Sequence, residues 1–248
     1  MRVSKNYDCT NCIVNECLIA KYSSRSGQAQ VNSAKIVASY KKHQPIVKEE
    51  TTAMGIYIIY SGKVLIVSEK EHGSKQIIRI AKPGDIIEHK ENENKLRSPF
   101  TAEAFGESVI CYIPKTIYFQ LIKEDPRLAN SLERFYTNKF IKAEKKLKNF
   151  MIMNVQAKMA DALLMVADSF DGEIPFSRKE LAELTGVSVD QVSRELKKLM
   201  SERIISKDSR NKEIAITDFS KLLNIVKRYD QNYSFSIIQN AVKKQKPN

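Results

Sequence analysis

The stretch FSRKELAELTGVSVDQVSRELKKLMSERII, residues 176–205, has the pattern of two short helices joined by a tight turn. Ser177 is placed to cap the first helix, and Glu180 three residues later completes a capping box. Gly186 falls where a tight turn between helices needs a residue that tolerates a positive φ angle. The stretch therefore predicts a helix-turn-helix, and ERIISKDSRNKEIAIT at 202–217 predicts a β-hairpin wing after it.

The second helix of this stretch has an apolar side and a polar side that can enter a major groove. Val192, Leu196 and Leu199 are predicted to face inward. Arg194 is the predicted base-reading residue, because arginine donates two hydrogen bonds to guanine, although Asp190 is also placed to pair with it. The predicted DNA-contacting residues are Ser188, Asp190, Gln191, Ser193, Arg194, Lys197, Lys198, Arg210 and Lys212. The alternative is a helical hairpin that binds another protein.

The overall charge agrees with an anionic partner. The 248 residues carry a formal net charge of +12, which favours nucleic acid through attraction to phosphates, although a basic soluble surface gives the same number. No apolar run is long enough to cross a membrane, and the N-terminus lacks a secretory signal. We therefore expect a cytoplasmic protein with reduced thiols. The glycines form no nucleotide-binding loop and no nucleophile–base set is legible, so we expect no enzyme.

Ahead of the helix-turn-helix, two further patterns stand out. From Ile46 to Pro114, short β-branched runs alternate with turn signals such as KPGD at 82–85, which is typical of an antiparallel β-sandwich or roll. Residues 23–30 look flexible, and a short helix is predicted around 32–40.

From Asp125 to Phe150, apolar residues recur every three or four positions, which predicts one long amphipathic helix. Such a helix is a candidate dimer seam, or it packs only against its own sheet. The seam residues are Leu128, Leu132, Tyr136, Phe140, Ala143, Leu147 and Phe150.

This order of elements resembles the Crp/Fnr superfamily of bacterial transcription regulators. The resemblance covers roughly residues 30–222 and rests mainly on GIYIIYSGKVLIV, RIAKPGD and SRKELAELTGVSVDQVSREL. It implies an α+β fold with an N-terminal antiparallel β-roll of the jelly-roll, cyclic-nucleotide-binding-like type, a long dimerisation helix and a C-terminal winged helix-turn-helix. The expected divisions are a cysteine-containing segment at 1–30, the β-roll at 31–122, the dimerisation helix at 123–151, the DNA-binding domain at 152–222 and a basic tail at 223–248.

The recognition segment VDQVSR, residues 189–194, is similar to the Val-Glu-x-x-Ser-Arg of the oxygen-sensing Fnr branch. That likeness implies a palindromic operator with TTGAT-like half-sites. Asp190 replaces the branch's glutamate, and its shorter side chain puts that one base contact in doubt.

The effector region departs from the cyclic-nucleotide binders. In IIEHK, residues 86–90, Glu88 and His89 stand where a Gly-Glu pair would meet a phosphate, and Arg97-Ser98 is one position out of register. We therefore do not expect cyclic AMP to bind.

Three of the four cysteines lie within nine residues, in CTNCIVNEC at 9–17. Fnr-type sensors hold a [4Fe–4S] cluster with Cys-x2-Cys-x5-Cys and one cysteine in the last β-roll strand. By that resemblance Cys9, Cys12, Cys17 and Cys111 are the expected ligands, one thiolate per iron, although the second gap here is x4.

Alternatives remain open for these cysteines. They are a vestigial motif in a regulator with another trigger, a zinc site completed by Cys111, a haem ligated by His89 or His43, and an iron–sulfur redox protein. The function expected from the resemblance is a homodimeric regulator that senses oxygen or nitric oxide, binds double-stranded DNA and works with RNA polymerase.

Overall fold

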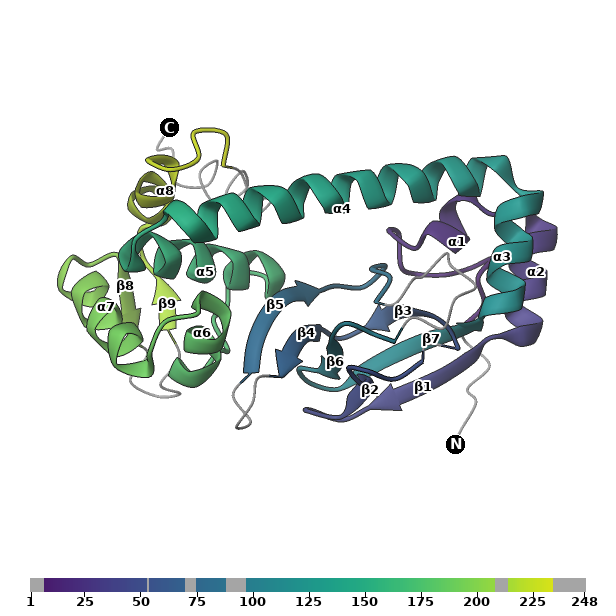
Figure 1. Ribbon diagram of the computed structural model, residues 1–248, viewed down its shortest axis with the longest axis horizontal. Coiled ribbons are helices and arrows are strands. Elements are labelled where there is room, and N and C mark those ends of the chain that lie inside the picture. The colour runs from purple at the N-terminus through teal and green to yellow at the C-terminus, as the bar shows by residue number, and fades with distance from the viewer. Residues whose placement is uncertain (1–6, 53, 70–74, 88–96, 208–213, 234–248) are drawn as a thin grey trace. The chain divides into compact units, whose positions relative to one another are not determined.

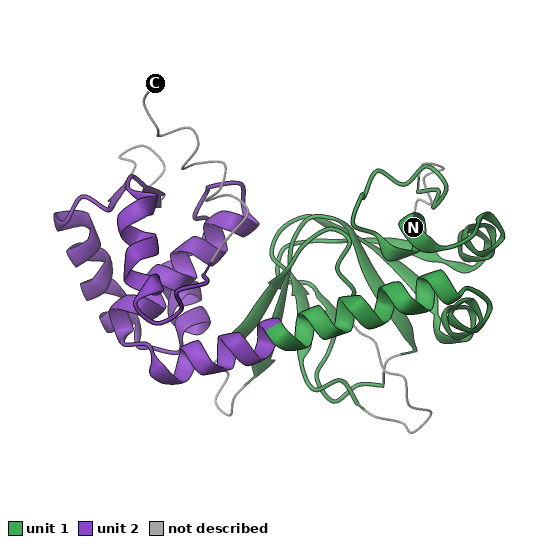
Figure 2. Cartoon of the chain, turned by 90° about the horizontal axis from the view of Figure 1, so that it is seen from above, with its two compact units in different colours: residues 1–141 green, residues 142–248 purple. Residues whose placement is uncertain are grey.

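The computed structural model describes residues 7–52, 54–69, 75–87, 97–207 and 214–233. The chain divides into two compact units, residues 1–141 and 142–248, shown in different colours in Figure 2. Among the described residues, no helix is long and apolar enough to cross a membrane.

Unit 1 is built on two antiparallel sheets, which confirms the predicted β-roll (Figure 1). In order across each sheet, the strands are β1 (Ile36–Tyr40), β7 (Ser108–Pro114) and β3 (Gly55–Ser61) in the first, and β2 (Pro45–Val47), β6 (Thr101–Ala104), β4 (Val64–Glu69) and β5 (Lys75–Ala81) in the second. The KPGD turn joins β5 to the chain that follows it. Gly84 has φ +88° and Asp85 N–H donates to the Lys82 carbonyl at 2.9 Å, which is the geometry of a type II turn at the predicted position.

The core of unit 1 has two parts. Ile59, Ile66 and Ile110 lie in a cluster formed by strands of both sheets. A second cluster joins β3 and β7 to the helices, through residues such as Tyr118 and Leu121. Complete burial of one such side chain stabilises the fold by about 1.5–3 kcal/mol, so both clusters contribute strongly.

Four helices carry the second cluster: α1 (Leu18–Tyr22), α2 (Arg25–Ala34), α3 (Lys115–Glu124) and α4 (Pro126–Ile152). The start of α4 is fixed by Asp125, whose carboxylate accepts hydrogen bonds from the backbone N–H of Arg127 at 3.1 Å and of Leu128 at 3.3 Å. The same carboxylate accepts from Ser24 N–H at 2.7 Å, which ties the beginning of α2 to the beginning of α4. The single long helix predicted from Asp125 onward is confirmed.

The prediction for residues 23–40 was wrong. The segment that looked flexible forms α2, and most of the predicted helix at 32–40 is strand β1. Two features explain the difference. Ser24 caps α2 by accepting from Gly27 N–H at 3.2 Å, and Gln28 is buried with its side-chain amide donating to the Ala20 carbonyl at 2.9 Å. A polar composition therefore hides a helix that tertiary contacts stabilise.

Unit 2 contains a helix-turn-helix with a hairpin wing, as predicted. Its elements are α5 (Val155–Ser169), α6 (Arg178–Thr185), α7 (Val189–Ser201), β8 (Ile205–Lys207), β9 (Ile214–Ile216) and α8 (Phe219–Lys227). Gly186 ends α6 in the left-handed conformation with φ 70°, and Val192, Leu196 and Leu199 of α7 are buried. The boundary expected at 222 falls within α8, whose buried face includes Leu222 and Val226.

Candidate functional site

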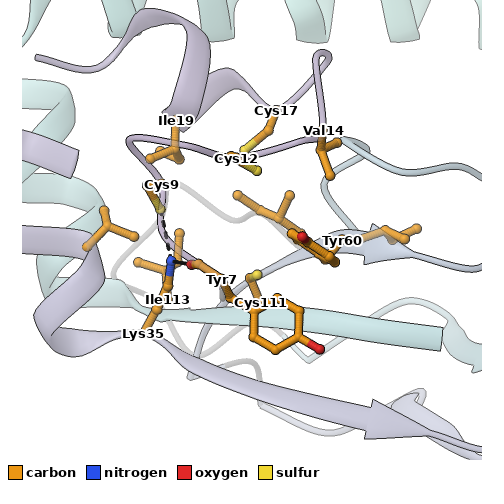
Figure 3. A pocket seen from close by; sticks show the side chains of 13 residues that line it. Tyr7, Cys9, Cys12, Val14, Cys17, Ile19, Lys35, Tyr60, Cys111 and Ile113 are labelled. Carbon is orange, nitrogen blue, oxygen red and sulfur yellow. Dashed lines mark hydrogen bonds between the residues drawn. The ribbon is translucent and has the colours of Figure 1, made fainter. Parts of the chain in front are cut away.

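All four cysteines line one pocket of unit 1 (Figure 3). The loop that precedes α1 carries Cys9, Cys12 and Cys17. Cys111 lies on β7, with its sulfur directed toward that loop. The space within the pocket, its open side included, is about 360 Å³. The structure therefore brings the four predicted ligands together, although about a hundred residues of sequence separate the loop from the strand.

Strand geometry explains why Cys111 faces the loop. Successive side chains of a strand point to opposite faces of the sheet. Ile110 belongs to the cluster between the two sheets, so Cys111 points the other way, toward the cluster that the helices cover. Its register partner on β3 is Ile58, which also lines the pocket.

Backbone hydrogen bonds hold the cysteine loop in place. Cys17 N–H donates to the Val14 carbonyl at 3.0 Å, and the Cys17 carbonyl accepts from Lys21 N–H at 3.0 Å, so Cys17 stands at the start of α1. At the other end, Cys9 N–H donates to Asn32 Oδ1 at 2.9 Å. The loop with the x4 gap is therefore anchored at both of its outer cysteines.

Two of the thiols form a pair. A hydrogen bond from Cys17 to the Cys12 sulfur lowers the pKa of Cys12, because it stabilises the Cys12 thiolate, and raises the pKa of Cys17, which donates it. Burial raises the pKa of Cys9 and raises that of Cys111 to about 11. Cys12 is therefore the cysteine best prepared to act as a thiolate ligand or nucleophile.

A lysine that the sequence did not single out also lines the pocket. Lys35 Nζ donates to Cys9 Sγ at 3.1 Å and also contacts the Tyr7 carbonyl (Figure 3). It donates to Asn32 Oδ1 as well, at 2.8 Å. Its positive charge lowers the pKa of Cys9 against the larger effect of burial. No spacing in the sequence could have revealed it, because it stands 26 residues from Cys9, just beyond α2.

The pocket holds the type of donor that an iron–sulfur cluster takes. Across the described ranges, no three His, Cys, Asp or Glu side chains are arranged to hold one metal ion. A cubane cluster takes one thiolate at each of four irons, and the pocket offers four thiols from two elements. For haem, His43 is exposed and faces Glu103 at 4.0 Å, away from the pocket-lining set, and His89 lies outside the described residues.

The predicted DNA-contacting residues divide into three groups. Ser188 and Gln191 cap α7: Ser188 N–H donates to Gln191 Oε1 at 3.0 Å, and Gln191 N–H donates to Ser188 Oγ at 3.2 Å. Arg210 and Lys212 lie outside the described residues. The remaining residues are on α7, where all are exposed except the half-buried Ser193; they are Asp190, Ser193, Arg194, Lys197 and Lys198.

The pairing of Asp190 with Arg194 is not formed. In the described part of the chain, Arg194 makes no ion pair with any acidic residue, and both side chains are exposed on α7. The guanidinium of Arg194 is therefore free to contact an external group.

The predicted dimer seam is split along α4. Leu128 and Leu132 are buried in the core of their own unit, and Tyr136 packs against that core. The rest of the stripe is exposed, with 63% of Phe140, 62% of Leu147 and 43% of Phe150 accessible; it consists of Phe140, Ala143, Leu147 and Phe150. Within the predicted stripe, this second half is the part that offers exposed apolar surface for another chain.

The structure describes only some of the residues at which the sequence departs from a cyclic-nucleotide site. Arg97 is exposed and lies 3.6 Å from Glu50, and Ser98 is buried with its hydroxyl donating to the Phe100 carbonyl at 2.8 Å. Glu88 and His89 lie outside the described residues, so the absence of cyclic AMP binding stays a prediction.

Two family models match the two units. The cyclic nucleotide-binding domain matches residues 37–125, and the Crp-like helix-turn-helix domain matches residues 157–225. The chain belongs to the Crp/Fnr family. Members of the Crp/Fnr family are DNA-binding transcription regulators rather than enzymes, and the helix-turn-helix of this chain has that role.

Several relatives give the same assignment. An anaerobic regulatory protein of Aggregatibacter actinomycetemcomitans is 21% identical over 226 residues, which cover 88% of this chain and 87% of the relative. The nitrogen fixation regulation protein FixK of Azorhizobium caulinodans is 25% identical over 194 residues, 75% of this chain and 77% of the relative. The structure of FixK2 from Bradyrhizobium japonicum matches with a TM-score of 0.68 at 21% identity, covering 77% of this chain and 97% of that one, and it shows the shared Crp/Fnr fold.

Proposed function

We propose that this Crp/Fnr regulator is a homodimer that senses oxygen or nitric oxide through a [4Fe–4S] cluster held by Cys9, Cys12, Cys17 and Cys111. The observation that carries the proposal is the meeting of all four cysteines in one pocket. The name of the relative from Aggregatibacter actinomycetemcomitans, an anaerobic regulatory protein, agrees with a response to oxygen.

When bound, the cluster supplies a group that reacts with oxygen or nitric oxide. The protein's own part is to hold four thiolates in an apolar pocket and to keep the loop of residues 9–17 against β7. Cluster binding can alter DNA affinity only if one arrangement of the chain holds the cluster better than another.

The KPGD turn offers a physical link between the cysteine loop and α4. A Cβ on Gly84 would lie 2.8 Å from the carbonyl carbon of Glu16, so the turn and the loop are in close backbone contact beside Cys17. On its other side, the Asp85 carboxylate pairs with Lys139 Nζ of α4 at 2.6 Å. A displacement of the loop therefore reaches α4 through two contacts.

The exposed half of the α4 stripe is the surface that we assign to the dimer. A symmetric dimer places two copies of α7 in successive major grooves about 34 Å apart, so the operator is a palindrome. The resemblance of residues 189–194 to the Fnr branch implies TTGAT-like half-sites. In this arrangement Arg194 and Ser193 read bases, Lys197 and Lys198 contact phosphates, and the dimer works with RNA polymerase.

A cluster-free regulator is the second candidate. It is favoured by the contact between Cys12 and Cys17, two neighbouring thiols that can respond to oxidants without iron. In this case the protein purified without oxygen holds no iron and still binds the operator.

The two candidates are separated by the iron and sulfide content of protein purified without oxygen. For the cluster, we expect about four irons and four sulfides per chain, with the content lost in Cys111→Ala. Ile36→Ala, on the neighbouring strand β1, is the matched control and keeps the full content. Wild-type protein that is free of iron and colourless contradicts the proposal.

A further inference from the structure

A pocket that holds ionised cysteines needs positive charge nearby. Burying an anion without a partner is costly, and the side chains that line this pocket are otherwise apolar residues, tyrosines and the cysteines themselves. Of the described lining residues, Lys35 is the one that carries a positive charge. The charge of this side chain is therefore available to compensate the thiolates.

The position of Lys35 is fixed by its surroundings. Its backbone N–H donates to the Val31 carbonyl at 2.8 Å, which closes the last turn of α2. Its Nζ is held between Cys9 Sγ, Asn32 Oδ1 and the Tyr7 carbonyl. Asn32 is itself anchored, because its side-chain amide donates to Asp8 and its oxygen accepts from Cys9 N–H at 2.9 Å. The ammonium group is thus held at one particular sulfur of the four.

We propose that Lys35 is a positioning residue for the Cys9 ligand, whose ammonium group donates to Cys9 Sγ and slows the loss of the cluster in oxygen. The inference rests on the proposed function, since it assigns a role toward the cluster that the four cysteines hold.

The physical reason is the charge of the loaded site. Four thiolates give the site a negative charge, and a nearby cation stabilises its more negative redox states. If dioxygen removed one electron from the loaded site and left as superoxide, the site would become less negative and would lose part of its attraction to the ammonium group. The ammonium group therefore opposes this oxidation, and it also raises the midpoint potential for one-electron reduction.

The test compares Lys35→Met with Lys35→Arg and the wild type. Protein purified without oxygen is exposed to air, and the rate at which the cluster absorbance is lost is measured together with the midpoint potential. We expect Lys35→Met to lose the absorbance on the order of tenfold faster, the effect of one charge-assisted hydrogen bond, and to have a lower potential. Lys35→Arg keeps both values near those of the wild type. Lys21→Met is the matched control, because Lys21 lies on α1 over the Tyr22 ring and outside the pocket-lining set.

The outcomes separate this inference from the proposed function. A wild-type protein that holds no iron defeats the proposed function and the role of Lys35 with it. Full iron content in every variant, with Lys35→Met equal to the wild type in both measurements, defeats the role of Lys35 alone. If Lys35→Met does not fold, Lys35→Gln takes its place as a neutral donor, and equal rates for Lys35→Gln and Lys35→Arg overturn the proposal.

Discussion

Removal of the Phe140 side chain tests the dimer surface of α4. Phe140 is 63% exposed, and a phenylalanine side chain buries roughly 200 Å² when fully covered, so a partner can cover about 125 Å² of it. At about 25 cal/mol per Å², and allowing for the methyl group that remains, Phe140→Ala costs about 2 kcal/mol per subunit. A symmetric dimer loses this binding free energy twice, about 4 kcal/mol, which raises its dissociation constant by at most roughly a thousandfold.

The assay is sedimentation equilibrium of the protein prepared without oxygen. We expect the dimer of Phe140→Ala to dissociate at a concentration between about tenfold and a thousandfold higher than the wild type. Its thermal unfolding should change little, since the side chain is mostly outside the core of its own unit. Ile36→Ala removes a side chain that is 49% exposed on β1 and should leave the dimer unchanged. Equal dissociation constants for Phe140→Ala and the wild type would refute the assignment of this surface.

Three further predictions concern the other parts of the structure. Arg194→Ala should reduce the preference for the operator over other DNA by about 1–3 kcal/mol, whereas Lys198→Ala should weaken binding to all sequences alike. Fluorescence anisotropy measures both effects. Identical behaviour of the two variants speaks against the assigned roles of these residues. Lys139→Met should leave the iron content intact but reduce the effect of air on DNA binding, because it breaks the ion pair with Asp85. Lys142→Met, a change on the exposed surface of α4, is the control. If Lys139→Met responds to air as the wild type does, this link is ruled out. Burial raises the pKa of Asp161. The folded state therefore loses stability as the pH rises above the unfolded pKa near 3.8, because the buried carboxylate must ionise. Asp161→Asn should therefore raise the melting temperature at pH 7, with a gain that shrinks as the pH falls, and a gain independent of pH would contradict this.

The sequence was most informative where structure depends on neighbours along the chain. The Ser177 cap and the left-handed Gly186 of the helix-turn-helix stand where local patterns placed them. Such features are predictable because their hydrogen bonds join residues three or four positions apart.

Long-range packing accounts for what the sequence missed. The polar segment that became α2 is stabilised by the burial of Val31 and Gln28, and neither contact has a local signature. The period of three or four residues correctly predicted the helix α4. The period alone could not distinguish Leu128, which its own unit covers, from Phe140, which is exposed. The contact of Lys35 with Cys9 likewise depends on α2 and the cysteine loop meeting in the fold.

Operator binding by protein prepared without oxygen shows whether the cluster controls the affinity for DNA. The affinity for a duplex with two TTGAT-like half-sites is measured by fluorescence anisotropy while the cluster absorbance is recorded, first without oxygen and then during exposure to air. We expect absorbance and affinity to fall together in the wild type, and Cys111→Ala to show neither the absorbance nor a change in affinity. A wild-type protein whose affinity is the same before and after the absorbance is lost would contradict this expectation.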